Sequence, residues 1–407
     1  MTHIQYSATR RKGAPTITPT ASIADLSFKS LEDRYSRQRL IAGWDQERLA
    51  KATILVAGAG ALGNEVLKNL ALLGIGNLLI VDFDRVEISN LSRSVLFNEC
   101  DIGRPKATTA ARALERLSPE IRVRAIDGDL ETDLGLGGIR ECDLVLGCVD
   151  SIYARWALNR ACQKAGKPWI NAGINASVGE ISLYVPGQGA CYECGMTQQM
   201  WRQIHERRSC MLMSRRLPAA TIPATTVIAS MTAALQVNEA LACLHGRSRL
   251  QSGEMVMVSL SPYSLSTCTM DAREDCLAHE DYSPSFFIDA TPAEITGAEL
   301  LGRIPGATSL QMDFDVLEGW LCSNCGPQFT VGRLSTTSAS QIECPQCKAQ
   351  RVPQLTHEIS QSDRLANCSL EQLGIPARSI LRLKTVSRTC YVELLTAKDA
   401  KEAKIAR

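Results

Sequence analysis

A glycine-rich turn between a buried strand and an amphipathic helix is the feature that most restricts how this chain can fold. The turn has the sequence Gly58-Ala59-Gly60-Ala61-Leu62-Gly63; it follows the apolar stretch 52–57, and residues 62–73 carry apolar side chains at helical spacing. Glycines allow the backbone to approach an anion, and the start of the next helix supplies unpaired N–H groups and partial positive charge. The pattern predicts a nucleotide-binding unit without naming the nucleotide.

Strand-like and helix-like segments alternate from residue 31 to about 246. After the glycine turn, strands are predicted at 77–81, 121–125, 144–148 and 256–260, and helices at 106–117 and 153–165. This alternation predicts an α/β fold with a doubly wound, mostly parallel sheet. Two further strands are predicted near the end of the chain, at 380–383 and 390–395.

The length of the chain, 407 residues, fits one large α/β domain with one or two small ones. Its formal net charge of +1 gives no electrostatic reason to expect nucleic acid or a membrane surface as a partner. The N-terminal residues are polar and no apolar run reaches 18 residues, so we predict a cytoplasmic protein with neither signal peptide nor membrane span. In that compartment disulfides are rare, and paired cysteines among the 16 favour zinc.

Acidic, polar and basic residues follow the predicted second strand, where a nucleotide would lie. Asp82 ends that strand at the position of a carboxylate that accepts hydrogen bonds from ribose hydroxyls. Asn90, Arg93 and Lys106 come next and offer several donors to phosphate oxygens. Most such turns belong to nicotinamide or flavin enzymes, but a cofactor with two phosphates does not require so many cations. These residues therefore favour a triphosphate.

Several short motifs together resemble the ThiF-type activating enzymes, which adenylate the C-terminus of ubiquitin-like proteins and of sulfur-carrier proteins. They occur in the order and spacing of that family and cover about residues 31–284. The motifs are Arg34-Tyr35-Ser36-Arg37-Gln38, the glycine turn, Asp82-Phe83-Asp84, Ser89-Asn90-Leu91-Ser92-Arg93, Gly103-Arg104-Pro105-Lys106 and Cys148-Val149-Asp150. Each motif alone is unspecific, but their combination is highly specific.

The resemblance implies a role for each matching residue. These residues are Gly58, Gly60 and Gly63 in the nucleotide loop, Asp82 and Asp84 in the motif at the ribose, Asn90, Arg93 and Lys106 at the ATP phosphates, and Asp150 at Mg²⁺. Fixed cations and Mg²⁺ neutralise charge as a carboxylate attacks the α-phosphate, so an acyl-adenylate is the expected product. Arg37 reaches the other subunit's ATP site in the family, which implies a homodimer. Ser151 departs from the family, which often has Asn there.

A first zinc site is predicted around Cys191 and Cys194, which have the spacing of a structural ligand pair. Family members usually close this site with a second Cys-x-x-Cys after the last strand of the domain. Here the matching positions are Cys276 and His279, which implies a structural Cys₃His site. Cys268 is a competing ligand, but it has no partner at short spacing and is favoured as an ordinary thiol.

A second zinc site is predicted outside the resemblance, in the last quarter of the chain. Its ligands are two Cys-x-x-Cys pairs at the spacing of a zinc ribbon, Cys322 with Cys325 and Cys344 with Cys347. A module held together by metal is stable with little core and often serves as a binding platform. We therefore expect residues 317–407 to recruit a downstream partner such as a conjugating enzyme.

Cys210 is the candidate nucleophile that would capture the adenylate as a thioester. It lies outside the zinc sets, in a basic segment that lowers a thiol pKa, and activating enzymes of the family place their cysteine in a similar crossover segment. The alternative is an incidental loop thiol. The cysteines at 142, 148, 162 and 243 lie in apolar periodic segments and are predicted to be core residues, and His205 is predicted to be exposed.

These predictions divide the chain into an N-terminal arm (1–30), an adenylation domain (31–284) with a crossover at about 195–224, a linker (285–316), a zinc ribbon (317–352) and a β-rich module (353–407). The leading hypothesis is ATP-dependent adenylation of the C-terminal Gly of a ubiquitin-like protein, thioester formation on Cys210 and transfer to a partner. The first alternative is adenylation of a sulfur-carrier protein for thiocarboxylate formation in cofactor biosynthesis. The second is a nucleotide-binding scaffold without enzymatic activity.

Overall fold

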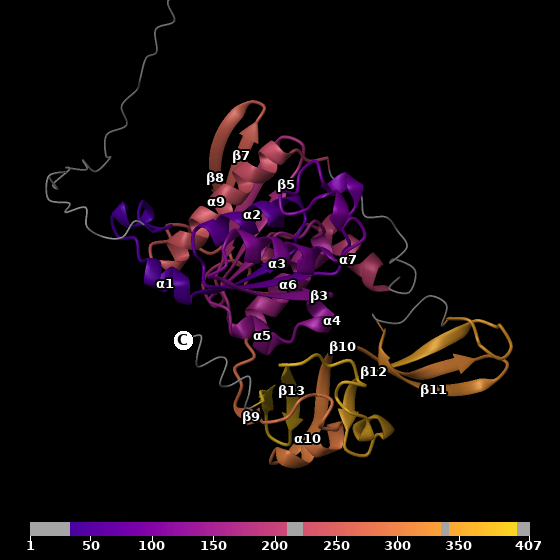
Figure 1. Ribbon diagram of the computed structural model, residues 1–407. Coiled ribbons are helices and arrows are strands. Elements are labelled where there is room, and N and C mark those ends of the chain that lie inside the picture. The colour runs from indigo at the N-terminus through magenta and orange to yellow at the C-terminus, as the bar shows by residue number, and fades with distance from the viewer. Residues whose placement is uncertain (1–32, 210–222, 335–341, 397–407) are drawn as a thin grey trace, which may run out of the picture.

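Two sheets, each with its own hydrophobic core, organise the residues that the structure describes. The structure is a computed structural model and describes residues 33–209, 223–334 and 342–396. An eight-stranded sheet lies in the first part of the chain and a six-stranded sheet in the last part (Figure 1). We call these the first domain and the C-terminal domain.

The sheet of the first domain has the strand order β3-β2-β1-β4-β5-β6-β7-β8. The strands are β1 (Thr53–Ala57), β2 (Asn77–Asp82), β3 (Arg122–Asp127), β4 (Leu144–Gly147), β5 (Trp169–Ile174), β6 (Val178–Tyr184), β7 (Glu254–Leu260) and β8 (Tyr263–Thr269). Strands β1 to β5 are parallel and β6 to β8 are antiparallel. The order reverses between β1 and β4, which makes their carboxyl ends the expected ligand crevice of a doubly wound sheet.

Helices cover both faces of this sheet, which confirms the predicted doubly wound architecture. One face carries α2 (Ala61–Leu72), α3 (Lys106–Leu117) and α9 (Thr226–Leu244), and the other carries α5 (Leu136–Arg140), α6 (Ile152–Ala165) and α7 (Gln198–Ser209). The predicted apolar stripe of α2 is buried at Val66, Leu67 and Leu70. Burying such a side chain contributes about 1.5–3 kcal/mol, so helix packing explains much of the fold's stability.

Local signals fix where these helices begin and end. The hydroxyl of Ser151 accepts a hydrogen bond from Ala154 N (3.1 Å) at the start of α6, and Gly166 ends this helix in the left-handed conformation (φ 64°).

Further short helices of the described chain are α1 (Gln46–Lys51), α4 (Leu130–Asp133), η2 (Gln38–Leu40), η3 (Ile88–Asn90), η4 (Glu99–Asp101), η5 (Tyr192–Gly195) and η8 (Arg364–Asn367).

Helix α9 is long and apolar enough to cross a membrane by length and composition, and half of that segment is buried in the structure. Its side chains Ala233, Val237 and Ala240 belong to the core between the helix and the sheet. The apolar character of α9 is therefore explained by its place in the core of the first domain.

The C-terminal domain is a second sheet with the order β11-β10-β13-β14-β9, with β12 also paired to β10. Its elements are β9 (Phe286–Ile288), α10 (Gly297–Arg303), β10 (Ala307–Cys322), β11 (Gly326–Arg333), β12 (Arg351–Ser360), β13 (Ile380–Thr385) and β14 (Thr389–Leu394). The first half of β10 packs in the core, and its second half extends with β11 and β12 into an arm (Figure 1).

The structure differs from the predicted boundaries in this region. Residues 285–316, expected to form a linker, contain β9, α10 and the first part of β10. The expected boundary at 352 falls inside β12, so the zinc ribbon and the β-rich module belong to one domain. The pattern was too weak to predict these elements because β9 has 3 residues and α10 has 7.

Candidate nucleotide site and metal centres

The glycine turn joins β1 to α2 at the carboxyl edge of the sheet, and two of its glycines are required by close backbone contacts. Gly58 has φ 96°, and a Cβ there would lie 2.6 Å from the carbonyl oxygen of Cys148. A Cβ on Gly63 would lie 2.0 Å from the carbonyl oxygen of Gly58. Gly60 precedes α2 without a side-chain cap, so the first N–H groups of the helix remain available to an anion.

Replacing Gly58 by alanine is expected to destabilise the protein by about 1–3 kcal/mol, because the side chain meets backbone and the residue is left-handed. Gly60→Ala is the matched control, since its φ is −72° and an added Cβ meets nothing within 4 Å. Thermal unfolding of both variants without nucleotide checks the prediction. Equal unfolding temperatures for both variants would contradict it.

Asp82 connects the glycine turn to the end of β2. Its carboxylate accepts hydrogen bonds from the backbone N–H groups of Ala59 (2.7 Å) and Asp84 (2.7 Å). Burial raises the pKa of Asp82, and the two backbone donors oppose that shift. Each carboxylate oxygen retains a lone pair that can accept a hydrogen bond from a ribose hydroxyl.

Lys106 and Asp84 form an ion pair beside Asp82. Lys106 is the first residue of α3, and its Nζ lies 2.8 Å from Oδ2 of Asp84. The Lys106 side chain is largely buried, whereas half of the Asp84 side chain is exposed. A phosphate oxygen at this site would compete with Asp84 for the ammonium group.

Asn90 and Arg93 lie on the segment around η3. Oδ1 of Asn90 accepts from Glu87 N (2.9 Å), and the Arg93 guanidinium donates to the carbonyl oxygen of Ser89 (2.6 Å). Both side chains are thus tied to their own segment. That bond uses only one N–H donor of the Arg93 guanidinium, so the remaining donors can also bind phosphate.

Asp150 follows β4 at the same edge of the sheet, and its side chain is exposed. Ser151, the departure from the family pattern, caps α6 immediately after it. Gln236 of α9 was not predicted, and its Nε2 donates to the carbonyl oxygens of Gly147 (3.2 Å) and Ile170 (2.8 Å). The backbone that carries Asp150 is therefore fixed on both sides.

Two further residues of this region were missed by the sequence reasoning. Asn64 is fully buried, donates to Ala59 O (2.7 Å) and accepts from Leu96 N (2.9 Å), so it holds the glycine turn in place. Arg155, one helical turn after Ser151, donates to Ala172 O (3.4 Å). A polar residue inside an apolar stripe was the only available signal for Asn64.

The N-terminal arginines lie outside this edge of the first domain. Arg34 donates to Ser118 Oγ (2.6 Å) and forms an ion pair with Glu120 (3.0 Å). Its side chain therefore binds the segment that follows α3 in the same chain. Arg37 is exposed and directly precedes η2. Its expected role needs a second subunit, so that role stays a prediction.

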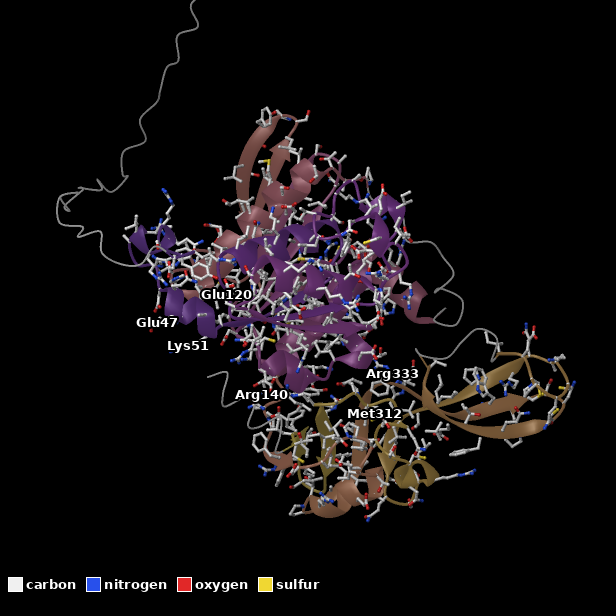
Figure 2. The ribbon with its side chains drawn as sticks, in the orientation of Figure 1. Glu47, Lys51, Glu120, Arg140, Met312 and Arg333 are labelled. Carbon is white, nitrogen blue, oxygen red and sulfur yellow. The ribbon has the colours of Figure 1, made fainter. Side chains whose placement is uncertain are left out.

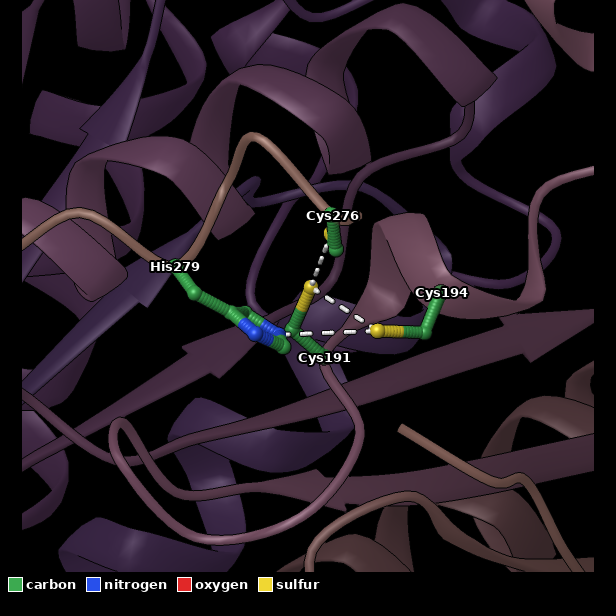
Figure 3. Close-up of side chains that lie close together, drawn as sticks. All are labelled: Cys191, Cys194, Cys276 and His279. Atoms are coloured by element: carbon green, nitrogen blue, oxygen red, sulfur yellow. Dashed lines mark hydrogen bonds between the residues drawn. The ribbon is translucent and has the colours of Figure 1, made fainter. Parts of the chain in front are cut away.

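The first cysteine cluster brings together the four residues predicted as a Cys₃His site. The ligand atoms of Cys191, Cys194, Cys276 and His279 lie within 4.8 Å of one another (Figure 3). Cys191 Sγ lies 3.8 Å from Cys194 Sγ and 3.7 Å from Cys276 Sγ. Zn–S bonds of about 2.3 Å place tetrahedral sulfurs about 3.8 Å apart, so the donor set fits zinc. Cys268 is exposed on β8, outside this cluster.

The second cluster lies at the end of the arm and also has a zinc-type donor set. The Sγ atoms of Cys322, Cys325, Cys344 and Cys347 lie within 4.8 Å of one another. The backbone N–H of Cys347 is the main cause that lowers the pKa of Cys344 to about 6. This shift favours the thiolate of Cys344, the form that binds metal, whereas the hydrogen bond to Cys347 raises the pKa of Cys325.

Cys210 lies outside the described residues, between α7 and the start of α9, so its proposed role stays a prediction. Cys142, Cys148 and Cys162 are buried, as predicted, and burial raises the pKa of each thiol. A raised pKa makes a cysteine a poor nucleophile at neutral pH. His205 is exposed, also as predicted.

Comparison with known proteins places most of the first domain in one family. The model of the ThiF family matches residues 35–278. The chain is 30% identical over 258 residues to the sulfur carrier protein adenylyltransferase of Thermus thermophilus, covering 60% of the chain and 89% of that protein. It is 32% identical over 200 residues to ubiquitin-like modifier-activating enzyme 5 of Dictyostelium discoideum, covering 46% and 51%.

The mouse protein MOCS3, an adenylyltransferase and sulfurtransferase, is 40% identical over 164 residues, which cover 40% of the chain and 36% of that protein. The chain thus spans about a third of this relative. Among solved structures, E. coli MccB with ATP has a TM-score of 0.50 and 25% identity, covering 62% of this chain and 75% of that one.

Proposed function

Because the chain belongs to the ThiF family, we propose that it is an ATP-dependent adenylyltransferase that activates the C-terminal carboxylate of a small protein of the ubiquitin-like or sulfur-carrier class. One observation carries this proposal: the fold places four features at the same edge of the sheet. They are the glycine turn, Asp82, Lys106 and Asp150. The ATP complex of the similar E. coli protein MccB supports the choice of nucleotide.

In this reaction a carboxylate oxygen of the protein tail attacks the α-phosphate of ATP. The bond between the α-phosphate and the bridging oxygen breaks, and pyrophosphate leaves with the bond's electrons. The N-terminus of α2, Arg93 and Lys106 would bind the phosphates and offset the charge that builds up on them. Asp82 would orient the nucleotide through its ribose.

Asp150 is the residue we assign to Mg²⁺. Its carboxylate is exposed and, among the described residues, has no hydrogen-bond or ion-pair partner. Carboxylate oxygens suit this cation, which usually keeps several waters and binds substrate phosphates. When bound, Mg²⁺ would neutralise negative charge on those phosphates. The two cysteine clusters are assigned to structural zinc, since four protein ligands leave no open position.

We also propose that two copies of the chain assemble, with Arg37 of one copy contributing to the ATP site of the other. The exposed position of Arg37 before η2 is compatible with this role. Arg37→Ala should then lower adenylation without changing the assembly itself.

The proposal is tested by ATP–pyrophosphate exchange with the full chain. Exchange should depend on a ubiquitin-like or sulfur-carrier protein that ends in Gly, and should disappear when that terminal residue is removed. ATP binding with no exchange for any such protein would instead favour the scaffold hypothesis, and exchange that needs no protein substrate would contradict a protein tail as the acceptor.

The fate of the adenylate separates the two substrate classes, and relatives of both kinds are similar to this chain. The sulfur-carrier relative matches over the greater share of its length, which favours release of the adenylate for thiocarboxylate formation. The thioester on Cys210, followed by transfer to a conjugating enzyme at the C-terminal domain, remains the other branch.

Replacing Cys210 by alanine decides between these branches. If the thioester forms, the variant should lose a thiol-sensitive adduct with the protein substrate but keep pyrophosphate exchange. Cys100→Ala, which removes another exposed thiol, is the control. Non-reducing gel electrophoresis detects the adduct. Absence of an adduct in the unmodified protein supports the sulfur-carrier branch, and an adduct that persists in Cys210→Ala excludes this cysteine.

A further inference from the structure

Arg333, the last residue of β11, reaches from the C-terminal domain to the first domain (Figure 2). Its Nη1 donates to the carbonyl oxygen of Glu131 in α4 (2.6 Å), a residue 202 positions earlier in the chain. The guanidinium carbon lies 3.9 Å from the centroid of the Phe314 ring. Only 6% of Arg333 is exposed, so a buried cation sits at the boundary between the domains.

Arg333 packs against a glycine that leaves room for its side chain. Gly374 has φ 85°, and a Cβ there would lie 2.6 Å from Cβ of Arg333. The charges that face the guanidinium come from Asp129, Glu131 and Asp133. Burial lowers the pKa of Arg333, and these carboxylates oppose that shift without cancelling it, so the cost of the buried cation is only partly offset.

The segment that Arg333 contacts is tied directly to the nucleotide edge. Residues 128–133 follow β3, and the backbone N–H of Gly128 donates to the carbonyl oxygen of Asp82 (3.3 Å). Asp129 accepts from Glu131 N (2.8 Å) at the start of α4, and its own N–H donates to Asp133 Oδ2 (2.8 Å). The segment is therefore one hydrogen-bonded unit between Arg333 and Asp82.

A second connection leads from the same segment toward Asp150. The hydroxyl of Tyr153 in α6 donates to Oε2 of Glu131 (2.9 Å). Tyr153 lies three residues after Asp150 in the chain. Glu131 thus contacts Arg333 through its carbonyl oxygen and the start of α6 through its carboxylate.

The other contacts between the domains include those of α5, of the end of α6 and of residues 280–282, where Arg382 pairs with Glu280 (3.0 Å) and the Tyr282 and Tyr391 rings stack. The backbone N–H of Gly137 donates to the carbonyl oxygen of Arg378 (2.7 Å), and Arg140 forms an ion pair with Glu393. Nζ of Lys164 lies 2.8 Å from Oδ2 of Asp313. None of these is hydrogen-bonded to the segment 128–133 or to Asp82 within the described chain. Arg140 therefore offers a matched control at the same boundary (Figure 2).

We propose that Arg333 is a positioning residue, through which the C-terminal domain holds residues 128–133 against Asp82 and thereby sets the affinity for ATP. This inference rests on the proposed function of the site. It gives the C-terminal domain a role in nucleotide binding, although it lies beyond the family match at residues 35–278.

Arg333→Met tests the proposal, because methionine keeps an apolar stem over Phe314 and removes the charge and the donors. We expect the Kd for ATP and the KM for ATP in pyrophosphate exchange to rise about tenfold, with little change in kcat. Arg333→Lys keeps the charge and should recover much of the affinity. Arg140→Ala should leave ATP affinity unchanged.

Direct titration with ATP and the exchange assay are both made on the full chain, after thermal unfolding shows that each variant is folded. Unchanged ATP affinity in Arg333→Met overturns the proposal, and so does an equal loss in Arg140→Ala, which indicates general undocking. If Arg333→Met does not fold, Arg333→Gln replaces it, and unchanged ATP affinity in that variant overturns the proposal. A wild-type protein that binds ATP without exchange contradicts the proposed function, while the titration still decides the role of Arg333.

Discussion

Replacing Asp150 by alanine is expected to reduce adenylate formation at least about 100-fold, because the phosphates lose the carboxylate that we propose holds Mg²⁺. The side chain is exposed, and the backbone around it is fixed by the Ser151 cap and by Gln236. The variant should therefore keep its fold and its unfolding temperature. Pyrophosphate exchange measured against Mg²⁺ concentration checks the prediction.

Two further variants make this result specific to the proposed metal ligand. Asp150→Asn keeps one oxygen and loses the charge, so it should need more Mg²⁺ and show an intermediate rate. Asp271→Ala removes an exposed carboxylate elsewhere and should leave the rate unchanged. Wild-type exchange in Asp150→Ala at low Mg²⁺ would show that this aspartate does not hold the cation.

Replacing Cys191 by alanine is expected to remove one of the two zinc ions that we assign to each chain and to destabilise the first domain by at least about 3 kcal/mol. The Tm should fall by roughly 6–12 °C. Cys191 is buried, and its Sγ also accepts from Asn159 Nδ2 (3.6 Å) in α6, so the site connects the cluster to the helix layer. Metal analysis and thermal unfolding measure the two effects.

The controls use cysteines in other environments. Cys268→Ala removes an exposed thiol outside both clusters and should retain both metal ions and the Tm. Cys325→Ala should also release one ion, but with a smaller effect on the first domain because that cluster lies at the end of the arm. Two bound zinc ions in Cys191→Ala would contradict the assignment of the first site.

Local pattern predicted the first domain well. The strands before and after the glycine turn are buried on both faces, so their apolar runs stand out from the sequence. The helix α6 was likewise recognisable, since its apolar spacing extends over 14 residues. The loop itself was predictable because φ 96° at Gly58 is a conformation that other residues rarely adopt.

The C-terminal domain was predicted less well. Its central strand β10 has 16 residues with an irregular burial pattern, and its partners β12 and β13 come from later in the chain. Bulges interrupt the pairing between β10 and β12, so the alternation of period two is lost. Sequence pattern therefore predicted the short strands near the end but assigned the start of the domain to a linker.

The glycine turn, the helix caps and the Cys-x-x-Cys pairs were determined by the sequence itself, because each depends on residues within one short segment. The family resemblance, and no local spacing, implied that Cys191 meets Cys276, which is 85 positions later in the chain, and the tertiary structure brings the two together. The tertiary structure alone decided that Arg333 bonds Glu131 across the domain boundary. Such contacts arise from the packing of whole sheets and helices, and no local spacing specifies which distant segments will be neighbours.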